Sequence, residues 1–424
     1  MLERDHRSTT GLRLCVHEVS ALALGERTRY RDRVLTVGRD EVASQLAHPA
    51  LADARVSCAS PGDSTRVVKV LDAVEPRSKG PAGGGVFPGL LAPAALQGHG
   101  ETHVLRGAAV LAAGFLPRAQ EAVVQMSGAA ARLSPLSAIH NLVIEFSPAS
   151  GADWQAVEAA VRLGMLRVAA HLAEAALAST PSQVEELDLP AGPRGSELPR
   201  VAVITNLQTQ GAFKDVLVYG RSLAGSLPTL IEPGELADGA VVSAQYGHPG
   251  LKNPTYVHQN HPVLAALRAS DELSLAGVVL SPEPVSEDQK RFVSEHAARL
   301  CRAVGADAAI VTKEGGGNAD ADVAMKMDAL EELGIAAVGL FAEMAGRDGT
   351  GPSLVVPPAH ATAMVSTGNY DEPVVLERVQ RALGGTRLDI AGADAIDELK
   401  LPTAVIYGSL NPLGWGYLTC AEAA

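Results

Sequence analysis

The sequence is poor in cysteine, aromatic residues and positive charge, and each shortage excludes a class of protein. Four scattered cysteines in 424 residues, with no Cys-x-x-Cys pair, provide neither a disulfide framework nor a zinc knuckle. Lys and Arg number 35 against 48 Asp and Glu, and the net charge of −13 argues against nucleic-acid binding, which needs clustered basic residues. Only 4% of residues are aromatic, whereas the 42 glycines suit α/β layers in which helices lie close to strands. We therefore expect a compact α/β protein that does not bind nucleic acid.

A long apolar run is also missing. The segment 107–116 is apolar, but it is too short and too rich in glycine to span a bilayer. The first residues are charged and contain no apolar core of a signal peptide. These features predict a protein that does not enter the membrane and that is located in the cytoplasm.

The length of the chain exceeds what one hydrophobic core usually supports, so we expect two domains. Residues 1–150 are predicted to form a β-rich N-terminal domain, because short β-type runs alternate with turn residues and helical periodicity is largely absent. An amphipathic helix is expected at 153–177. The prolines that follow it make 151–199 a helix with a Pro-rich linker.

Residues 200–424 are predicted to form an α/β domain, because apolar strands alternate there with helical patterns. This alternation indicates βαβ units and a mostly parallel, doubly wound sheet, with its ligand crevice outside the carboxyl ends of the strands. The strands are expected at 201–207, 240–243, 277–280, 308–312 and 336–341, and the helices at 262–272, 286–304 and 320–333.

Candidate substrate-binding residues follow several of these strands. Gln208 and Gln210 come after the first strand, where their amides can bind a substrate or serve the structure. The Gly-rich turn after the fourth strand contains Glu314, Gly316 and Asn318. Its backbone N–H groups can converge on an anion at a helix N-terminus, or the turn can be a simple βα connection with a helix cap.

Glu343, Arg347 and Asp348 follow the fifth strand. A carboxylate and a guanidinium in one loop can bind the two ends of a zwitterion, or they can form an ion pair that fixes the loop. Both interpretations remain open.

Two groups of histidines lie close together in the sequence. His258 is a candidate catalytic residue that can donate a hydrogen bond to substrate, or it can be a structural loop histidine. His248 and His261 lie near it in the sequence, but no third ligand of suitable spacing follows, so we predict no metal site. The alternating His99, Glu101 and His103 are expected to form a solvated strand face, so this set lies outside the predicted site.

Several irregular segments of the sequence are rich in glycine and asparagine. They include Gly100-Glu101-Thr102-His103-Val104-Leu105-Arg106-Gly107, Leu207-Gln208-Thr209-Gln210-Gly211, Lys252-Asn253-Pro254-Thr255-Tyr256-Val257-His258, Glu314-Gly315-Gly316-Gly317-Asn318-Ala319-Asp320 and Ala345-Gly346-Arg347-Asp348-Gly349. These segments resemble the alpha/beta proprotein subunit of component B in the glycine, sarcosine and betaine reductases. The resemblance extends over most of the chain and implies a substrate-binding role for Asn253, which lies in one of the matching segments.

The sequence departs from this family at the position of self-cleavage. In the family an Asn-Cys step splits the proprotein, and the cysteine becomes a pyruvoyl group whose ketone is thought to capture the substrate amine. The matching positions here are Gln245 and Tyr246, and a phenol cannot undergo the rearrangement, which needs Ser, Thr or Cys. The nearest suitable hydroxyl, on Ser243, lies three residues earlier. We therefore predict an uncleaved chain with no pyruvoyl cofactor, in which Tyr246 is a candidate catalytic residue.

The resemblance implies a subunit of a complex. Its partner would be a homologous component B chain that carries a selenocysteine or cysteine nucleophile, in a homo- or hetero-oligomer. Its substrate would be a small amine or a compound derived from an amino acid, and its chemistry the reductive cleavage of a C–N or related C–S bond. Two alternatives remain open: a non-catalytic scaffold subunit, and a repurposed enzyme of specialised metabolism that forms or breaks C–N or C–S bonds.

Overall fold

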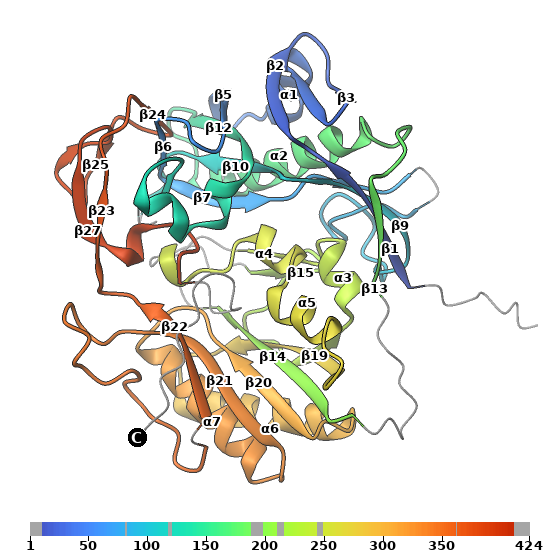
Figure 1. Cartoon of the computed structure of the whole chain (residues 1–424), viewed down its shortest axis with the longest axis vertical. Helices are drawn as coiled ribbons and strands as arrows, with labels where there is room; N and C mark the ends of the chain where they lie inside the picture. The colour runs from blue at the N-terminus through green and yellow to red at the C-terminus, as the bar shows by residue number, and fades with distance from the viewer. Residues whose placement is uncertain are drawn as a thin grey trace, which may run out of the picture.

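The computed structural model describes residues 11–80, 83–117, 121–187, 198–209, 216–243, 249–361 and 363–410. The chain has a mixed α/β fold, as the sequence predicts. A six-stranded sheet with its helices forms the lower part in Figure 1, and several smaller sheets form the upper part.

The six-stranded sheet is mostly parallel, which confirms the prediction for this part of the chain. Each neighbouring pair is parallel except that of β17 and β19, which is antiparallel at one edge. The strands, in spatial order, are β17 (Thr229–Ile231), β19 (Ser274–Glu283), β14 (Arg200–Gln208), β20 (Ala308–Thr312), β21 (Ala336–Glu343) and β22 (Ala363–Asn369).

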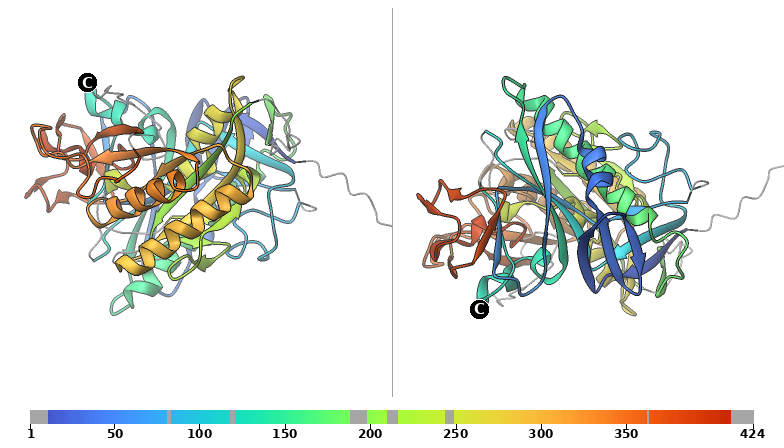
Figure 2. Two further views of the ribbon diagram at one scale, coloured as in Figure 1. Left: turned by 90° about the horizontal axis from the view of Figure 1, so that it is seen from below. Right: turned by 90° about the horizontal axis from the view of Figure 1, so that it is seen from above.

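Helices cover both faces of this sheet. The helices α6 (Glu287–Ala303) and α7 (Asn318–Glu331) lie side by side on one face, as the left view of Figure 2 shows. Val293, Ala297 and Cys301 recur on the buried side of α6, the spacing of an amphipathic helix. On the opposite face, Leu264 and Leu267 pack in one core with strand residues. They belong to α5 (Pro262–Arg268), which lies there with α3 (Pro233–Ala237).

One predicted strand does not join this sheet. The segment expected at 240–243 forms β18 (Val241–Val242), which pairs with β15 (Leu217–Val218) in a small antiparallel sheet with β16 (Arg221–Ser222). The edge next to β19 is occupied by β17 instead. β18 ends before Ser243, whose backbone N–H donates to the hydroxyl of Thr255 and whose hydroxyl donates to the carbonyl oxygen of Asn253.

The N-terminal part consists largely of strands around one long helix, α2 (Trp154–Glu174), which confirms the helix predicted at 153–177. Asp153 caps α2 by accepting a hydrogen bond from the backbone N–H of Ala156. One sheet has the order β13 (Gln183–Leu187), β1 (Leu12–Glu18), β9 (Gly100–Arg106), β8 (Arg77–Ser78); a second has β5 (Leu51–Ala59), β12 (His140–Pro148), β10 (Ala108–Ala113), β7 (Val70–Val74); a third has β2 (Ala21–Gly25), β4 (Val34–Gly38), β3 (Arg29–Arg31).

Two local features of this part were not predicted. The short helix α1 (Arg39–Leu46) buries only Val42 and Leu46, too few apolar positions to produce a helical pattern. The apolar run at 102–111 is divided between β9 and β10 by Gly107. Gly107 has a φ of +89°, and a Cβ there would lie 2.8 Å from the carbonyl oxygen of Val19, so only glycine fits this turn.

The C-terminal segment returns to the N-terminal sheets. The strand β24 (Arg381–Leu383) is parallel to β6 (Thr65–Val68), which in turn pairs with β11 (Val123–Gln125). Figure 1 shows this segment beside the N-terminal strands. The division into domains at residues 150 and 199 stays a prediction. The remaining elements are β23 (Pro373–Leu376), β25 (Arg387–Leu388), β26 (Ala393–Asp394), β27 (Leu399–Pro402), α4 (Thr255–Gln259) and 3-10 turns at Ala129–Leu133, Pro135–Ala138, Pro249–Leu251 and Thr403–Val405.

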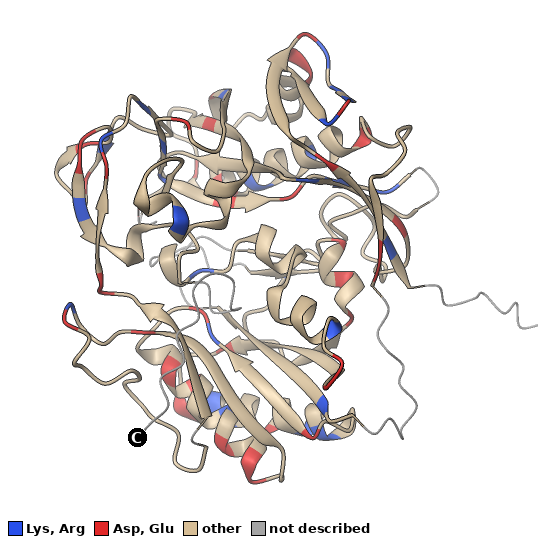
Figure 3. Cartoon of the chain, viewed as in Figure 1, with Lys and Arg blue, Asp and Glu red and all other residues tan. Residues whose placement is uncertain are grey.

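No helix in the described part of the chain is long and apolar enough to cross a membrane. Figure 3 shows acidic residues interspersed with basic ones over both parts of the molecule.

Candidate functional site

Glu314 connects the segments that meet at the carboxyl ends of the parallel strands. It follows β20, and its carboxylate is buried. One oxygen accepts a hydrogen bond from the backbone N–H of Gln208 at 3.0 Å, and the other accepts one from the backbone N–H of Asn253 at 2.8 Å. The structure therefore brings three of the predicted site residues into direct contact.

Glu283 adds a second carboxyl group at this edge. It is the last residue of β19, where it is the register partner of Gln208, and it accepts a hydrogen bond from the backbone N–H of Glu314 at 3.2 Å. Burial raises the pKa of Glu283 well above its usual range, and the neighbouring carboxylates of Asp322 and Glu314 raise it further. The position of Glu283 at the end of a buried strand was the only signal for it in the sequence.

A second buried polar cluster lies between the sheet and the N-terminal strands. Asp72, in β7, accepts hydrogen bonds from both the backbone and the hydroxyl of Thr255, at 3.1 and 2.5 Å. The phenol of Tyr407 donates to Asp72 at 3.2 Å. Lys252 donates to the carbonyl oxygen of Leu71 at 3.2 Å. Sequence analysis did not assign Asp72, Lys252 or Tyr407, because nothing local in the sequence indicates that they meet.

Lys252 is fully buried, and burial lowers the pKa of its ammonium group. The nearby carboxylates of Asp72 and Glu314 act in the opposite direction. The two clusters thus lie close enough to influence each other electrostatically.

Ser243 is held firmly in this cluster. Its backbone N–H donates to the hydroxyl of Thr255 at 2.9 Å, and its own hydroxyl donates to the carbonyl oxygen of Asn253. Residues 244–248, which contain the predicted Gln245, Tyr246 and His248, lie outside the described residues, as does Gln210.

His258 and His261 are both buried and uncharged at neutral pH. Burial lowers the pKa of His258 to about 3, and His261 and Lys252 contribute to the shift. Burial also lowers the pKa of His261 to about 3. His261 caps α5 by accepting from the backbone N–H of Leu264 at 3.4 Å, so its role is structural.

Neither ring nitrogen of His258 has a hydrogen-bond partner in the described ranges. A buried polar group without a partner is costly, so an unsatisfied imidazole beside a cavity is a candidate for binding a ligand. His258 lines such a cavity of about 190 Å³ with Arg106, Gln259 and Arg268. Among the described residues, the groups of three ligands that could hold a metal do not include either histidine.

The Gly-rich turn combines structural and accessible features. Lys313 is buried and ion-paired with Asp320, so its charge is satisfied within the turn. Gly315 and Gly317 both have a φ of +70°, and exposed Asn318 begins α7. The turn is therefore a βα connection whose glycines are conformationally required, and its end is open to solvent.

Gly316, unlike Gly315 and Gly317, has no positive φ. A Cβ on Gly316 would lie 2.2 Å from the Sδ of Met344, so the glycine permits close approach of the loop after β21. The backbone N–H of Gly315 donates to the carbonyl oxygen of Leu251 at 3.2 Å. The three loops predicted to meet at this edge are thus in contact.

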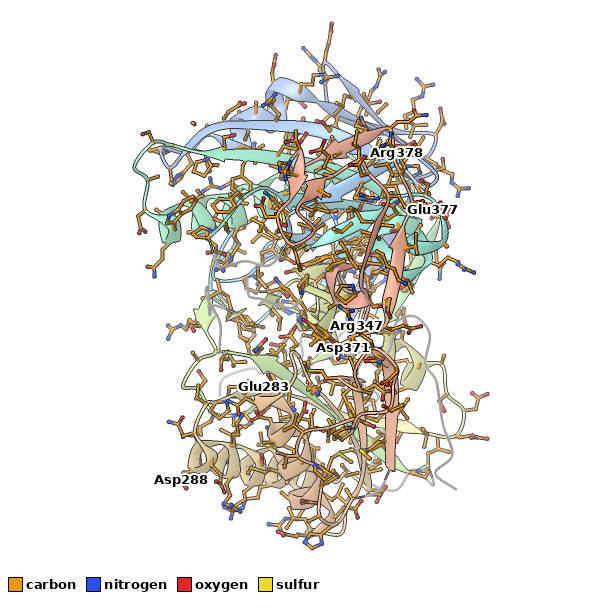
Figure 4. All side chains as sticks on the ribbon, turned by 90° about the vertical axis from the view of Figure 1, so that its left-hand side faces the viewer. Glu283, Asp288, Arg347, Asp371, Glu377 and Arg378 are labelled. Atoms are coloured by element: carbon orange, nitrogen blue, oxygen red, sulfur yellow. The ribbon has the colours of Figure 1, made fainter. Side chains whose placement is uncertain are left out.

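The side chains of the arginine loop are not part of the buried clusters. Arg347 and Asp348 are exposed, and Glu343 accepts a hydrogen bond from Ser366. Figure 4 shows Arg347 near Asp371, which accepts a hydrogen bond from the backbone N–H of Gly346, the residue before it, at 3.2 Å. Among the described ion pairs, none joins Arg347 to Glu343 or Asp348, so its guanidinium remains open to a ligand from solvent.

Comparison with known proteins decides the family. The sequence model of the glycine/sarcosine/betaine reductase component B subunits matches residues 11–420. The chain belongs to this family. It is 35% identical over 417 residues to "Glycine reductase complex component B subunits alpha and beta" of Peptoclostridium acidaminophilum, covering 95% of this chain and 97% of the relative.

Two further relatives from the same organism carry different names. The chain is 32% identical to "Sarcosine reductase complex component B subunit alpha" over 87% of this chain and 90% of the relative. It is also 32% identical to "Betaine reductase complex component B subunit alpha" over 90% of each. No solved structure matches the chain. The resemblance inferred from the motifs is confirmed.

Proposed function

We propose that this chain is an uncleaved component B subunit without a pyruvoyl group. It binds a small carboxylated amine and presents it to a homologous partner subunit that carries the cysteine or selenocysteine nucleophile. The observation that carries this proposal is the pair Gln245 and Tyr246 at the positions where the family's self-cleavage occurs.

The residues present do not fit a pyruvoyl group. Its formation requires a side-chain nucleophile that attacks the preceding carbonyl and then leaves by elimination, and a tyrosine phenol cannot leave in this way. Ser243 has a suitable hydroxyl, but that hydroxyl is buried and donates to the carbonyl oxygen of Asn253. No step of the proposed function therefore passes through a pyruvoyl ketone.

The absence of a ketone favours substrates that have no use for one. A ketone forms a neutral Schiff base with a primary amine and a charged iminium ion with a secondary amine. A quaternary amine can form neither. A substrate with a fully substituted nitrogen could not react with a ketone, so a subunit without one can still bind it. In the proposed reaction the partner's thiolate or selenolate attacks the α-carbon, the C–N bond breaks and the amine leaves with the bonding electrons.

The geometry supports a binding role at the edge where the loops meet. Arg347 is exposed in the loop after β21, where a guanidinium can bind a carboxylate. His258, whose ring nitrogens are unsatisfied, lines a cavity with Arg106, Gln259 and Arg268. Glu314 fixes Gln208 and Asn253 relative to each other, which keeps these loops in place.

Titration calorimetry with betaine, sarcosine and glycine tests the proposal, with the chain alone and with its homologous partner. We expect betaine to bind more tightly than glycine, and Arg347→Ala to weaken binding by about tenfold through loss of a charged contact. Arg378→Ala is the control, because Arg378 is an exposed arginine of the C-terminal segment. Failure of all three compounds to bind, with or without the partner, would refute the substrate-binding role.

A further inference from the structure

A separate cluster of metal-binding side chains lies on the N-terminal sheet. Cys15 of β1 is the register partner of His103 of the parallel strand β9, and Arg13 is the partner of Glu101. Alternate residues of a strand point to the same face, so Cys15, Glu101 and His103 share one face of the sheet. One ligand atom from each of these three residues lies within 4.8 Å of the other two.

We propose that Cys15, Glu101 and His103 form a zinc site. A thiolate, an imidazole and a carboxylate are all ligands of Zn²⁺, and three protein ligands leave a fourth tetrahedral position for water. The site lies on the face opposite Leu14 and Val16, which pack against the core residue Ala237. It is therefore distinct from the substrate site and joins β1 to β9.

His17 supports this assignment as a positioning residue. Its Nε2 lies 2.9 Å from the Nδ1 of His103. When the Nδ1–H of His103 donates to this nitrogen, the Nε2 of His103 keeps its lone pair and can bind a metal. A second residue that holds the far nitrogen of a ligand histidine is typical of metal sites. His17 is completely buried, its ring lies nearly parallel to that of His103, and it packs edge-on against Tyr30. Its own Nδ1 has no partner in the part of the chain described.

Burial lowers the pKa of His17 to about 4 and also lowers the pKa of His103. Burial and the nearby Glu101 raise the pKa of the Cys15 thiol, so zinc must displace its proton. We therefore expect proton release when zinc binds.

Glu101 provides access for the ion. Its side chain is 52% exposed, and it forms an ion pair with Arg13 at 2.5 Å. A carboxylate has two oxygens, so one can bind the metal while the other keeps the contact with Arg13. Cys15 is nearly buried, whereas His103 is partly exposed, so an ion can enter from the Glu101 side.

Zinc titration of the chelator-treated full chain tests this site. We expect one Zn²⁺ per chain and a higher melting temperature with zinc, and we expect Co²⁺ to give the absorption of a thiolate-bound metal. Cys15→Ser and His103→Gln should abolish stoichiometric binding. His17→Gln should weaken binding by roughly 10- to 100-fold, because it removes only the support of a ligand.

Matched controls separate this site from other cysteines and histidines. Cys301→Ser removes a buried cysteine of the other core, and His99→Gln removes an exposed histidine next to β9. Both should keep full binding. If Cys15→Ser does not fold, His103→Gln and Glu101→Gln decide the question. Absence of stoichiometric zinc in the native chain, or binding that survives both Cys15→Ser and His103→Gln, would overturn the proposal.

Discussion

At the scale of single residues, Glu314 illustrates how a buried carboxylate can organise two loops. Both of its oxygens accept from backbone N–H groups, those of Gln208 and Asn253. Hydrogen bonds to a charged acceptor are worth more than neutral ones, and a buried N–H left without a partner is costly. The stability of this edge of the sheet therefore depends on the charge as well as the shape of Glu314.

Glu314→Gln should destabilise the protein. The amide keeps one oxygen but turns an NH₂ group toward a backbone N–H donor, so we expect a loss of about 2 kcal/mol in the free energy of unfolding. Urea denaturation measures it. Glu287→Gln, on the exposed surface of α6, is the control and should leave the midpoint unchanged. Equal midpoints for both variants would show that the Glu314 contacts do not stabilise this edge.

The buried histidines predict a loss of stability in mild acid. The folded pKa of His258 is about 3, below the value of 6.5 for an unperturbed histidine, so the unfolded chain binds more protons between these values. Stability therefore falls as the pH is lowered through that window. Between about pH 7.5 and about pH 5.5, His258 alone should account for about 1.4 kcal/mol of the loss.

The measurement compares urea unfolding at both pH values in the native chain and in His258→Gln. The variant should show a pH-dependent loss smaller by that amount, whatever its absolute stability. His99→Gln removes an exposed histidine and should keep the native dependence. A His258→Gln chain with the full native pH dependence would mean that folding does not lower the pKa of His258.

Sequence reasoning located some of these residues and missed others for a physical reason. Glu314 and Asn253 could be predicted, one because it follows a buried strand and the other because it lies in a motif shared with the family. Asp72 and Tyr407 meet only through the fold, because they lie 335 positions apart in the sequence, so no local pattern indicates their contact. Arg347 follows a strand as predicted, yet its side chain is exposed, because the position of a loop does not fix the direction of its side chains.

At the scale of elements, the turn before α7 depends on glycine geometry. Gly317 precedes α7 with a φ of +70° and a ψ of −99°, a combination that other residues avoid. Nothing lies within 4 Å of the position where its Cβ would be, so a substitution would meet backbone strain and no clash.

Gly317→Ala should therefore destabilise the protein by roughly 1–3 kcal/mol through strain alone. Gly80→Ala is the matched control, because it also has open space but no positive φ. Thermal unfolding of the two variants should separate them clearly. Equal melting temperatures would mean that the turn relaxes to an unstrained conformation.

The elements that were predicted best are those with long buried runs. β14, β19, β20 and β21 are largely buried on both faces, and such continuous apolar segments are distinct in sequence. The strand β18 has only two residues, so it contains no long apolar run that would indicate which strand it pairs with. Its place in a small antiparallel sheet depends on β15, which the sequence did not reveal.

At the scale of the whole molecule, Arg66 joins the N-terminal part to the C-terminal segment. It is completely buried in β6, and burial lowers its pKa to about 10. Its guanidinium donates to the side chain of Gln125 and to the carbonyl oxygens of Glu377, Ala395 and Asp397. One side chain thus holds several turns of the C-terminal segment.

Arg66→Met should cost about 3 kcal/mol or more, because it leaves several buried carbonyl groups without donors. Arg378→Ala removes an exposed arginine of the same segment and should have little effect. Figure 4 shows Arg378 beside Glu377 at this end of the molecule. Urea unfolding and limited proteolysis of the C-terminal segment measure the difference; two equally stable variants would refute the role of Arg66.

The central claim, that the chain functions without self-cleavage, is tested most directly by its intact mass. Because Gln245 and Tyr246 replace the step that rearranges, mass spectrometry of the purified chain under denaturing conditions should give one species near 43.8 kDa. That species should not react with a hydrazine probe for ketones. Two fragments that divide the chain between Ser243 and Gly247, one of them with a carbonyl-reactive N-terminus, would contradict the account.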